Sequence, residues 1–347
     1  MAPMTSELRT ADFDYDLPAS SIATVAAEPR DSARLLVDRG ASVEHSRMSA
    51  FPTLLRPGDV VVVNDTRVLP ARVRFRRAGG GSGEALLLEE RAGGWWEALV
   101  RPSAKLRPGD MVEVGDGFRI EFGDDLGQGR RVIRPVAPDG LVAALDRFGE
   151  MPLPPYLGNT VLDDPDRYQT VYAARPASAA APTAGLHFTS ALLGEVEAAG
   201  ATVAHVELVV GLATFRPMTV DRVDEHVMHQ EAYRIPPDTW EAVQNARRVI
   251  AVGTTTVRAL ESAAAAAGAL EGRTGLFVRR GFDWQVVDAM LTNFHLPCSS
   301  LLVMIDAFVG PRWRELYAMA LAEGYRFLSF GDAMFLERRR RGDGGGT

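Results

Sequence analysis

The amino-acid sequence predicts an α/β protein, in which a main α/β domain with a mostly parallel sheet carries an inserted small β-barrel domain. The first observation is the apolar run Val60–Val63, which follows the turn pair Pro57-Gly58 as a buried strand would. The second is a series of short β-like segments, separated by glycine-rich turns, between residues 71 and 138. The third is the alternation of helical and strand patterns from residue 139 onward, which is typical of a sheet covered by helices.

These observations divide the chain into a discontinuous main domain, an insertion and a tail. The patterns on both sides of the insertion are α/β, so both flanks are expected to build one sheet. The C-terminal arginine run ends in glycines and is expected to be disordered. The expected boundaries are 1–70 plus 139–337 for the main domain, 71–138 for the β-barrel domain and 338–347 for the tail.

Within these boundaries, periodicity and turn signals predict the individual elements. The insertion is expected to hold strands at Val73–Phe75, Glu84–Leu88, Trp95–Val100, Met111–Val114, Arg119–Phe122 and Arg131–Val136. Helices are expected at Leu141–Phe148, Ser190–Ala199, Thr239–Arg247, Thr254–Ala267, Ser300–Phe308 and Trp313–Ala322. Strands of the main domain are expected at Thr202–Val210, Val249–Val252, Trp284–Leu291 and Arg326–Phe330.

Composition narrows the class of protein. The 347 residues are 46% hydrophobic and 24% charged, as in ordinary globular domains. No secretory signal and no apolar run of about 20 residues is found, so we expect a cytoplasmic protein without a membrane span. The single cysteine, Cys298, excludes an internal disulfide and a cysteine-based zinc site, and we expect it to be a small structural residue. The net charge of −7 disfavours nonspecific coating of nucleic acid but permits a local basic patch.

Two polar segments follow expected strands and are candidate binding segments. Asn64-Asp65-Thr66-Arg67 comes after the first strand, where α/β proteins bind ligands at the carboxyl ends of the sheet. The alternative is a turn that Asp65 caps. Gly253-Thr254-Thr255-Thr256 follows a strand and opens a helix, whose free N–H groups suit a carboxylate or ribose hydroxyls. The alternative there is a capped helix start; neither a Walker loop nor a dinucleotide fingerprint is present.

Three histidines lie in polar or glycine-rich breaks and are candidates for proton transfer near neutral pH. They are His187, His229 and His295. The alternative for each is a structural or solvated side chain. His226, His229 and Glu231 do not have the spacing of the helical zinc motif, so no metal site is expected. The residues alone thus predict an α/β enzyme with a polar site and leave the reaction open.

Taken together and in order, many segments resemble the S-adenosylmethionine:tRNA ribosyltransferase-isomerase family of queuosine biosynthesis. The matches cover nearly the whole chain. They are Phe13–Pro18, Arg34–Val37, Asn64–Arg72, Trp96–Pro102, Pro152–Tyr156, Arg167–Ala173, Ala181–Phe188, Gly253–Thr255 with Val257-Arg258, Thr292–Pro297, Tyr325–Phe327 and Gly331–Met334.

The resemblance implies a reaction, its substrates and a two-domain architecture. S-adenosylmethionine would donate its ribosyl moiety to the aminomethyl group of 7-aminomethyl-7-deazaguanine in the tRNA anticodon stem-loop. The product would be epoxyqueuosine in tRNA, with adenine and methionine released. The resemblance implies no cofactor beyond S-adenosylmethionine as substrate. We expect a monomer.

The resemblance also directs the assignment of site residues. His187, His295 and Asp65 are the expected proton-transfer residues. Thr254 and Thr255 are expected to hold the amino-acid or ribose part of the donor, Tyr156 and Phe294 to stack on a base, and Arg67, Arg72 and Arg258 to meet phosphate or carboxylate. The other expected substrate-binding residues are Asn64, Thr66, Thr183, Gly185, Thr214, Phe215, His229, Glu231, Gly253, Thr292, Asn293 and Asp332.

Some positions depart from the family pattern and keep other functions open. Val209 or Val210 stands where the family usually has histidine, and Ala213 where it has glycine. Arg279-Arg280-Gly281 replaces a tyrosine-proline pair before glycine. One alternative is therefore a paralogue that uses the same donor on a free small-molecule amine. A nonenzymatic RNA-binding protein and a methyltransferase are further alternatives, the latter disfavoured because no glycine-rich donor loop follows the first strand.

Overall fold

The computed structural model describes residues 8–40, 42–77, 79–157, 162, 164–211 and 217–338. Nine strands form its larger sheet. They are β1 (Arg34–Asp38), β2 (Val43–Arg47), β3 (Asp59–Asn64), β13 (Thr202–Leu208), β14 (Glu231–Arg234), β15 (Arg248–Val252), β16 (Glu271–Thr274), β17 (Ala289–Asn293) and β18 (Ala333–Glu337). Their spatial order is β16-β14-β13-β3-β15-β17-β18-β1-β2.

The larger sheet is mixed, which corrects the expected mostly parallel sheet. Strands β13, β3, β15 and β17 run parallel at its centre. Strand β18 is antiparallel to β17, and β1 is parallel to β18, while β14, β16 and β2 extend the sheet antiparallel at its edges. The parallel centre brings the carboxyl ends of four strands to one edge of the sheet.

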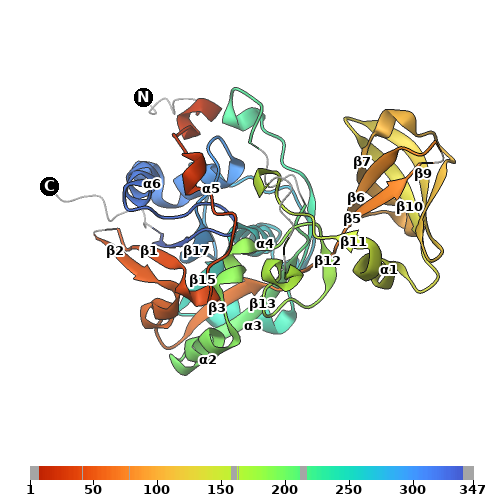
Figure 1. The fold of residues 1–347 in the computed structure, drawn as a ribbon. Coiled ribbons are helices and arrows are strands. Elements are labelled where there is room, and N and C mark those ends of the chain that lie inside the picture. Colours follow the sequence, from red (N-terminus) through yellow and green to blue (C-terminus); the bar gives the residue numbers. More distant parts are fainter. Residues whose placement is uncertain are drawn as a thin grey trace.

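Helices cover both faces of this sheet, as Figure 1 shows. Alternate residues of β3 point to opposite faces: Val60 and Val62 enter one core, and Val61 and Val63 the other. The first core is closed by α3 (Pro237–Asn245), α4 (Thr254–Ala265), α5 (Ser300–Val309) and α6 (Trp313–Ala322). The second is closed by α2 (Ser190–Ala198) and the 3-10 helix Met48–Leu54. Both faces of the central strands are therefore buried, which explains their continuous apolar runs.

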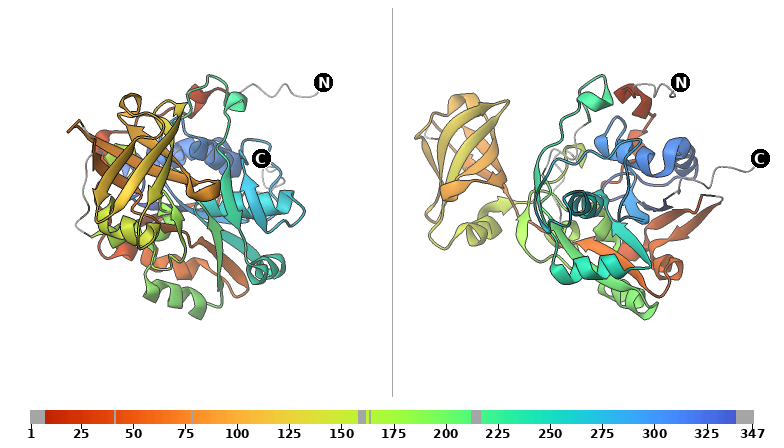
Figure 2. Two further views of the ribbon diagram at one scale, coloured as in Figure 1. Left: turned by 90° about the vertical axis from the view of Figure 1, so that its right-hand side faces the viewer. Right: turned by 180° about the vertical axis from the view of Figure 1, so that it is seen from behind.

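A second, antiparallel sheet of seven strands stands beside the first (Figure 2). Its members are β5 (Arg72–Arg76), β6 (Ser82–Glu90), β7 (Trp96–Arg101), β8 (Met111–Gly115), β9 (Phe118–Gly127), β10 (Arg130–Val136) and β11 (Gly149–Glu150), in the order β11-β5-β6-β7-β10-β9-β8. The sheet curls around its own core. All six strands expected in the insertion are confirmed as strands.

Helix α1 (Leu141–Phe148) packs with this second sheet, although its sequence was assigned to the main domain. Its buried residues Ala144 and Leu145 belong to the same core as Val73 and Phe122. Strand β11 follows directly and pairs with β5. The helix sits at the junction of the two sheets in Figure 1.

Two expected strands of the main domain differ in the structure. The expected strand Arg326–Phe330 is wrong, because the carboxylate of Asp332 accepts the backbone N–H of Arg326 at 2.8 Å and holds this segment in a turn. The strand comes later, as β18. Strand β17 begins at Ala289 rather than Trp284, whose ring packs edge-on against Phe308 of α5. All the expected helices are present within a few residues of their predicted bounds. Among the described residues, no helix is both long and apolar enough to cross a membrane.

Candidate active site

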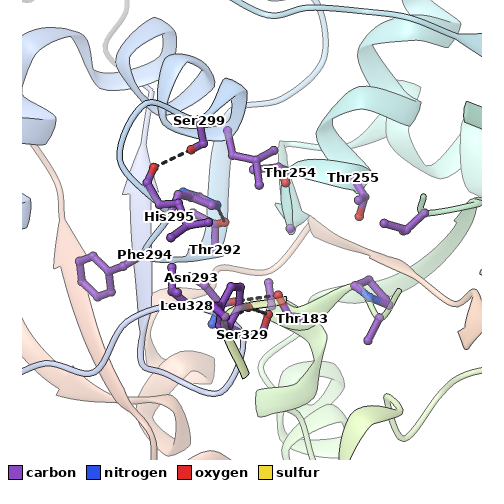
Figure 3. Close-up of a pocket in the computed structure, with 18 residues that line it drawn as sticks. Thr183, Thr254, Thr255, Thr292, Asn293, Phe294, His295, Ser299, Leu328 and Ser329 are labelled. Carbon is purple, nitrogen blue, oxygen red and sulfur yellow. Dashed lines mark hydrogen bonds between the residues drawn. The ribbon is translucent and has the colours of Figure 1, made fainter. Parts of the chain in front are cut away.

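A pocket opens at the edge of the larger sheet where the parallel strands end (Figure 3). Its walls come from segments that follow β13, β15 and β17 and from the 3-10 helix Thr183–His187. Nine residues that the sequence singled out line it: Tyr156, Thr183, Gly253, Thr254, Thr255, Thr292, Asn293, Phe294 and His295. The crevice rule for α/β sheets therefore predicted where this pocket lies.

The start of helix α4 forms one wall. Gly253 precedes the helix with φ of +87°, a conformation that side chains disfavour, and lets the chain turn sharply from β15 into α4. The first N–H groups of a helix lack intrahelical acceptors, so Thr254 and Thr255 offer backbone donors beside their hydroxyls. Asn64, at the end of β3, donates from Nδ2 to Thr255 Oγ1 at 3.2 Å. Asn64 thus supports this wall from below.

His295 lines the opposite wall and is held as a neutral ring. Burial lowers its pKa to about 3. The Tyr317 hydroxyl accepts the His295 backbone N–H at 3.0 Å and lies 3.3 Å from Nδ1, where it can donate its own proton. The ring proton then sits on Nε2, which is 3.2 Å from Thr292 Oγ1. His295 consequently presents a hydrogen-bond donor on the side of Thr292, which also lines the pocket.

His187 lies behind the pocket. Its ring is also neutral, but the ring proton is on Nδ1, whereas that of His295 is on Nε2. Asn293 Oδ1 accepts from the Thr183 hydroxyl at 3.2 Å, which orients the amide so that Nδ2 donates to His187 Nε2 at 3.1 Å. Burial, with the charges of Arg326 and Arg30, lowers the pKa of His187 to about 4. His187 therefore orients Asn293 and, through it, Thr183.

The two aromatic candidates differ in their availability for stacking. The Phe294 ring is fully buried and stacks on Phe327 with centroids 4.6 Å apart. Figure 3 shows the ring directed away from Thr254 and Thr255. Tyr156 lines the pocket and hydrogen-bonds the Ser329 hydroxyl. Phe294 thus supports the wall, and Tyr156 is the aromatic side chain that a base would meet.

Asp65 lies outside the residues that line the pocket. Its carboxylate is 3.6 Å from Nδ1 of His205, on β13, which sequence reasoning did not single out. The aromatic ring of Tyr172 packs edge-on against His205. The structure therefore groups Asp65 with a second histidine and separates it from His187 and His295.

Several other expected site residues are engaged within the protein. Thr66 bonds Ser178 at 2.6 Å, and Asp332 accepts the backbone N–H groups of Arg34 and Arg326 at 2.8 Å. Arg258 forms a buried ion pair with Glu231, which in turn accepts from the Gly211 N–H at 3.1 Å. These residues fix the segments around the pocket, and none of them lines it.

The remaining candidates are scattered. Gly185 is buried, and a Cβ there would lie 2.0 Å from the Tyr172 hydroxyl. His229 and Arg67 are exposed, and Arg72 is half-buried at the start of β5. Thr214 and Phe215 lie outside the described residues.

Sequence reasoning missed several residues that complete the pocket. Ser299, Leu328 and Ser329 line it, and Tyr317 holds His295 from helix α6. Leu328 has φ of +71°, and Ser299 caps helix α5 by accepting from the Leu302 N–H at 3.3 Å. The serine before an apolar helical run was a readable signal for the cap. Tyr317 gave no such signal, because only tertiary packing brings α6 to His295.

The fold and the site define an α/β protein with a mainly apolar pocket at the carboxyl ends of its parallel strands, in which threonine, serine, asparagine and histidine side chains suit a ligand with carboxylate, hydroxyl and aromatic parts. Within the described residues, no cluster of three or more histidine, cysteine or acidic side chains is placed to hold a metal. The model of the family described as "Queuosine biosynthesis protein" matches residues 10–336. The chain belongs to this family.

Relatives of the chain carry one shared name. A protein of Rubrobacter xylanophilus is 51% identical over 334 residues, covering 95% of this chain and 98% of that protein. A protein of Desulfitobacterium hafniense is 44% identical over 341 residues, covering 95% of this chain and 100% of that protein. Both are named S-adenosylmethionine:tRNA ribosyltransferase-isomerase. The crystal structure of an S-adenosylmethionine tRNA ribosyltransferase from Thermotoga maritima is similar, with 32% identity, a TM-score of 0.53, and 93% and 99% of the two chains covered.

Proposed function

We propose that this protein transfers and isomerises the ribosyl moiety of S-adenosylmethionine onto 7-aminomethyl-7-deazaguanine at the wobble position of a tRNA. Epoxyqueuosine forms in the tRNA, and adenine and methionine leave. Family membership supports the reaction. The observation that carries its location is the pocket that joins the α4 helix start to a buried, neutral histidine.

The pocket offers a place for each part of the donor. The N–H groups and hydroxyls of Thr254 and Thr255 suit the methionine carboxylate or the ribose hydroxyls at the positive end of the helix dipole. The Tyr156 ring suits the adenine face, as base-stacking aromatic side chains do. The Nε2–H of His295 suits an adenine ring nitrogen, which must gain hydrogen-bonding or a proton as adenine leaves.

The proton balance of the reaction limits the remaining roles. The sulfonium acidifies the adjacent 5′ carbon, so a base removes a proton there, while the acceptor amine must stay uncharged to attack the sugar. Asp65 lies beside His205 and outside the pocket that holds the donor, so we do not assign it as this base; His187 is a positioning residue that acts through Asn293. Holding amine and sugar together supplies the proximity that the transfer needs.

The test is incubation of the protein with S-adenosylmethionine and substrate tRNA, followed by mass analysis of the tRNA nucleosides and assay of released adenine. Epoxyqueuosine together with adenine supports the proposal. Adenine release with the free deazaguanine base, but none with tRNA, would overturn it. That alternative acceptor is disfavoured because the relatives at 51% and 44% identity are named for action on tRNA.

The histidines provide a test of the site assignment. Substitution of His295 by alanine removes the donor at the pocket wall, and substitution of His187 releases Asn293. We expect each to lower turnover well beyond threefold, a change of about 0.65 kcal/mol in the barrier. Turnover of both variants within threefold of the parent would contradict the assignment.

Three further parts of the proposal concern the setting of the reaction. The anticodon stem-loop is the part of the tRNA recognised, since it carries the wobble base. The protein acts in the cytoplasm as a monomer. The division into a main domain, an inserted domain and a tail is retained, but the end of the inserted domain is moved from residue 138 to near residue 150, because α1 packs on the second sheet.

A further inference from the structure

Strand β5 carries three arginines on one face. Arg72, Arg74 and Arg76 alternate with the buried residues Val73 and Phe75, so their side chains project from the same outer side of the curled sheet. Arg74 pairs with Glu84 of β6, and Glu84 pairs with Arg101 of β7, which adds Arg101 to that side. We call Arg72, Arg74, Arg76 and Arg101 the arginine ladder.

The guanidinium groups of the ladder are largely available to a ligand. Within the described part of the chain, Arg72 and Arg76 make no ion pair. Arg76 is exposed, whereas Arg72 is half-buried and its Nε is enclosed by protein without a hydrogen-bond partner among the described residues. Arg74 meets Glu150 at 2.8 Å, but the two side chains are 67% and 48% exposed, so the pair is weak. Arg101 is 81% exposed and 3.9 Å from Glu84. Carboxylates therefore neutralise little of the ladder.

The ladder lies next to the connection between the two sheets. Strand β3 ends at Asn64, under the pocket wall, and Arg72 opens β5 eight residues later. Eight extended residues span at most about 28 Å. Figure 1 shows β5 at the side of the second sheet that faces the larger one. A polymer with one residue in the pocket can thus reach the ladder with its neighbouring residues.

The charge of this part of the chain contrasts with the rest. Residues 71–150, which build the second sheet with α1 and β11, contain thirteen basic and thirteen acidic residues, a net charge of 0, whereas the whole chain carries −7. The negative net charge thus lies outside the second sheet, and a polyanion meets less repulsion there than on the rest of the protein. Arginine forks bind phosphate in two-pronged geometry, which positions a nucleic acid without reading its sequence.

We propose that the arginine ladder binds the sugar–phosphate backbone of the RNA whose base enters the pocket. This inference rests on the proposed function and extends it, because it assigns an RNA-binding role to the second sheet. The ladder orients the RNA strand and contributes affinity, and it takes no part in the chemistry.

The test is the affinity of the full-length protein for substrate tRNA at several KCl concentrations. Each of the variants Arg72→Gln and Arg76→Gln should raise Kd about three- to tenfold, since a single phosphate contact is lost. Each should also reduce the slope of log K against log salt by about one. Arg76→Lys should restore the slope, because the ammonium keeps the charge.

Arg247→Gln is the matched control. Arg247 is exposed, precedes β15 at the opposite end of the parallel strands and makes no ion pair in the part of the chain that the structure describes. Its substitution should leave both Kd and slope unchanged. Thermal unfolding of each variant shows that the fold is kept.

The outcomes separate this inference from the proposed function. If the parent modifies tRNA but both glutamine variants bind within twofold of it, with the same salt slope, the ladder is not the RNA surface. If all arginine variants including Arg247→Gln weaken binding equally, the attraction is diffuse and the inference also fails. If the parent neither binds nor modifies tRNA, the proposed function itself fails.

Discussion

At the scale of single residues, the tautomer of His295 decides what the pocket can do. We infer that the ring donates from Nε2, because the Tyr317 hydroxyl lies 3.3 Å from Nδ1 and can donate to it. A protonated ring is strongly disfavoured at neutral pH, since burial lowers the pKa of His295 to about 3. His295 therefore acts as a neutral hydrogen-bond donor whose orientation Tyr317 sets.

Replacing Tyr317 by phenylalanine should lower kcat about tenfold, or ~1.4 kcal/mol in the barrier. The change keeps the ring that packs against Trp313 and Phe294 but frees Nδ1, so the ring proton is no longer confined to Nε2. Steady-state kcat and KM measure the effect. Tyr325→Phe is the control, because that tyrosine belongs to the same aromatic cluster but bonds His45 instead. Equal losses in both variants would contradict a role in positioning His295.

The two buried histidines also predict how stability depends on pH. Their pKa values in the folded protein, about 4 for His187 and about 3 for His295, lie below the ordinary 6.5. In the unfolded chain the histidines bind protons as pH falls through 6.5, while the folded protein does not. Stability should therefore be fully present above pH 6.5 and fall between pH 6.5 and 4, by roughly 3 kcal/mol for His187 alone.

Urea unfolding at pH 7.5, 6 and 5 measures this loss, and His187→Gln tests its source. The variant should be less stable at pH 7.5 but lose less stability on acidification, because one buried titrating group is gone. The same loss in the variant and the parent would show that other groups cause it.

The sequence could predict the pocket residues that lie at the ends of strands. It could not predict the residues that hold their side chains in place. Thr254 and His295 follow the apolar strands β15 and β17, and Thr292 lies near the carboxyl end of β17, where the rule for α/β sheets applies. Asp65 satisfies the same rule but turns toward His205, because its neighbour Asn64 takes the position under α4. Which side a residue at a strand end takes is set by packing, and the sequence pattern does not contain it.

At the scale of elements, the 3-10 helix Thr183–His187 shapes one wall of the pocket by close contact with Tyr172. A Cβ on Gly185 would lie 2.0 Å from the Tyr172 hydroxyl, which is buried without a hydrogen-bond partner among the residues that the structure describes. Gly185→Ala should destabilise the protein by about 1–3 kcal/mol through overpacking. Tyr172→Phe should recover part of the loss by removing the clashing oxygen. Thermal unfolding of the two single variants and the double variant measures this coupling. Additive effects would show that the contact is not the cause.

The second prediction at this scale concerns the contribution of helix α4 to binding of the donor. Thr254→Val removes a hydroxyl from the pocket wall and should raise KM for S-adenosylmethionine about tenfold, with a smaller change in kcat. Thr256→Val is the matched control, since the Thr256 hydroxyl bonds the Val252 carbonyl at 2.7 Å inside the core. A rise in KM for Thr256→Val as large as that for Thr254→Val would point to a damaged helix instead of a lost contact.

At the scale of the whole molecule, the alternation of sequence patterns predicted two sheets, but it did not predict every strand of the sheets or the helix that packs on each. The insertion was recognisable because its short strands alternate with glycine turns, and all six are present. Strands β1, β2, β14, β16 and β18 were not expected, since segments of only four or five residues, several of them charged as in Glu231–Arg234, resemble loops. Helix α1 was predicted within the main domain but packs on the second sheet, because an amphipathic pattern does not say which core its apolar face meets.

An ion pair joins the two sheets. The final prediction concerns its effect on tRNA binding. Arg273 of β16 lies 2.5 Å from Glu89 of β6, and both side chains are about half exposed, at 49% and 47%. Such a pair adds little stability, so Glu89→Arg should change Tm by no more than about 2 °C. It joins the larger sheet, which holds the pocket, to the second sheet, which holds the arginine ladder. An RNA that contacts both sheets gains affinity from their fixed spacing.

Glu89→Arg should therefore raise KM for tRNA about threefold, although the added positive charge alone would lower it. The double variant Glu89→Arg/Arg273→Glu should restore the parent value at saturating S-adenosylmethionine. A KM that falls in Glu89→Arg would show that net charge, and not the spacing of the sheets, controls RNA binding.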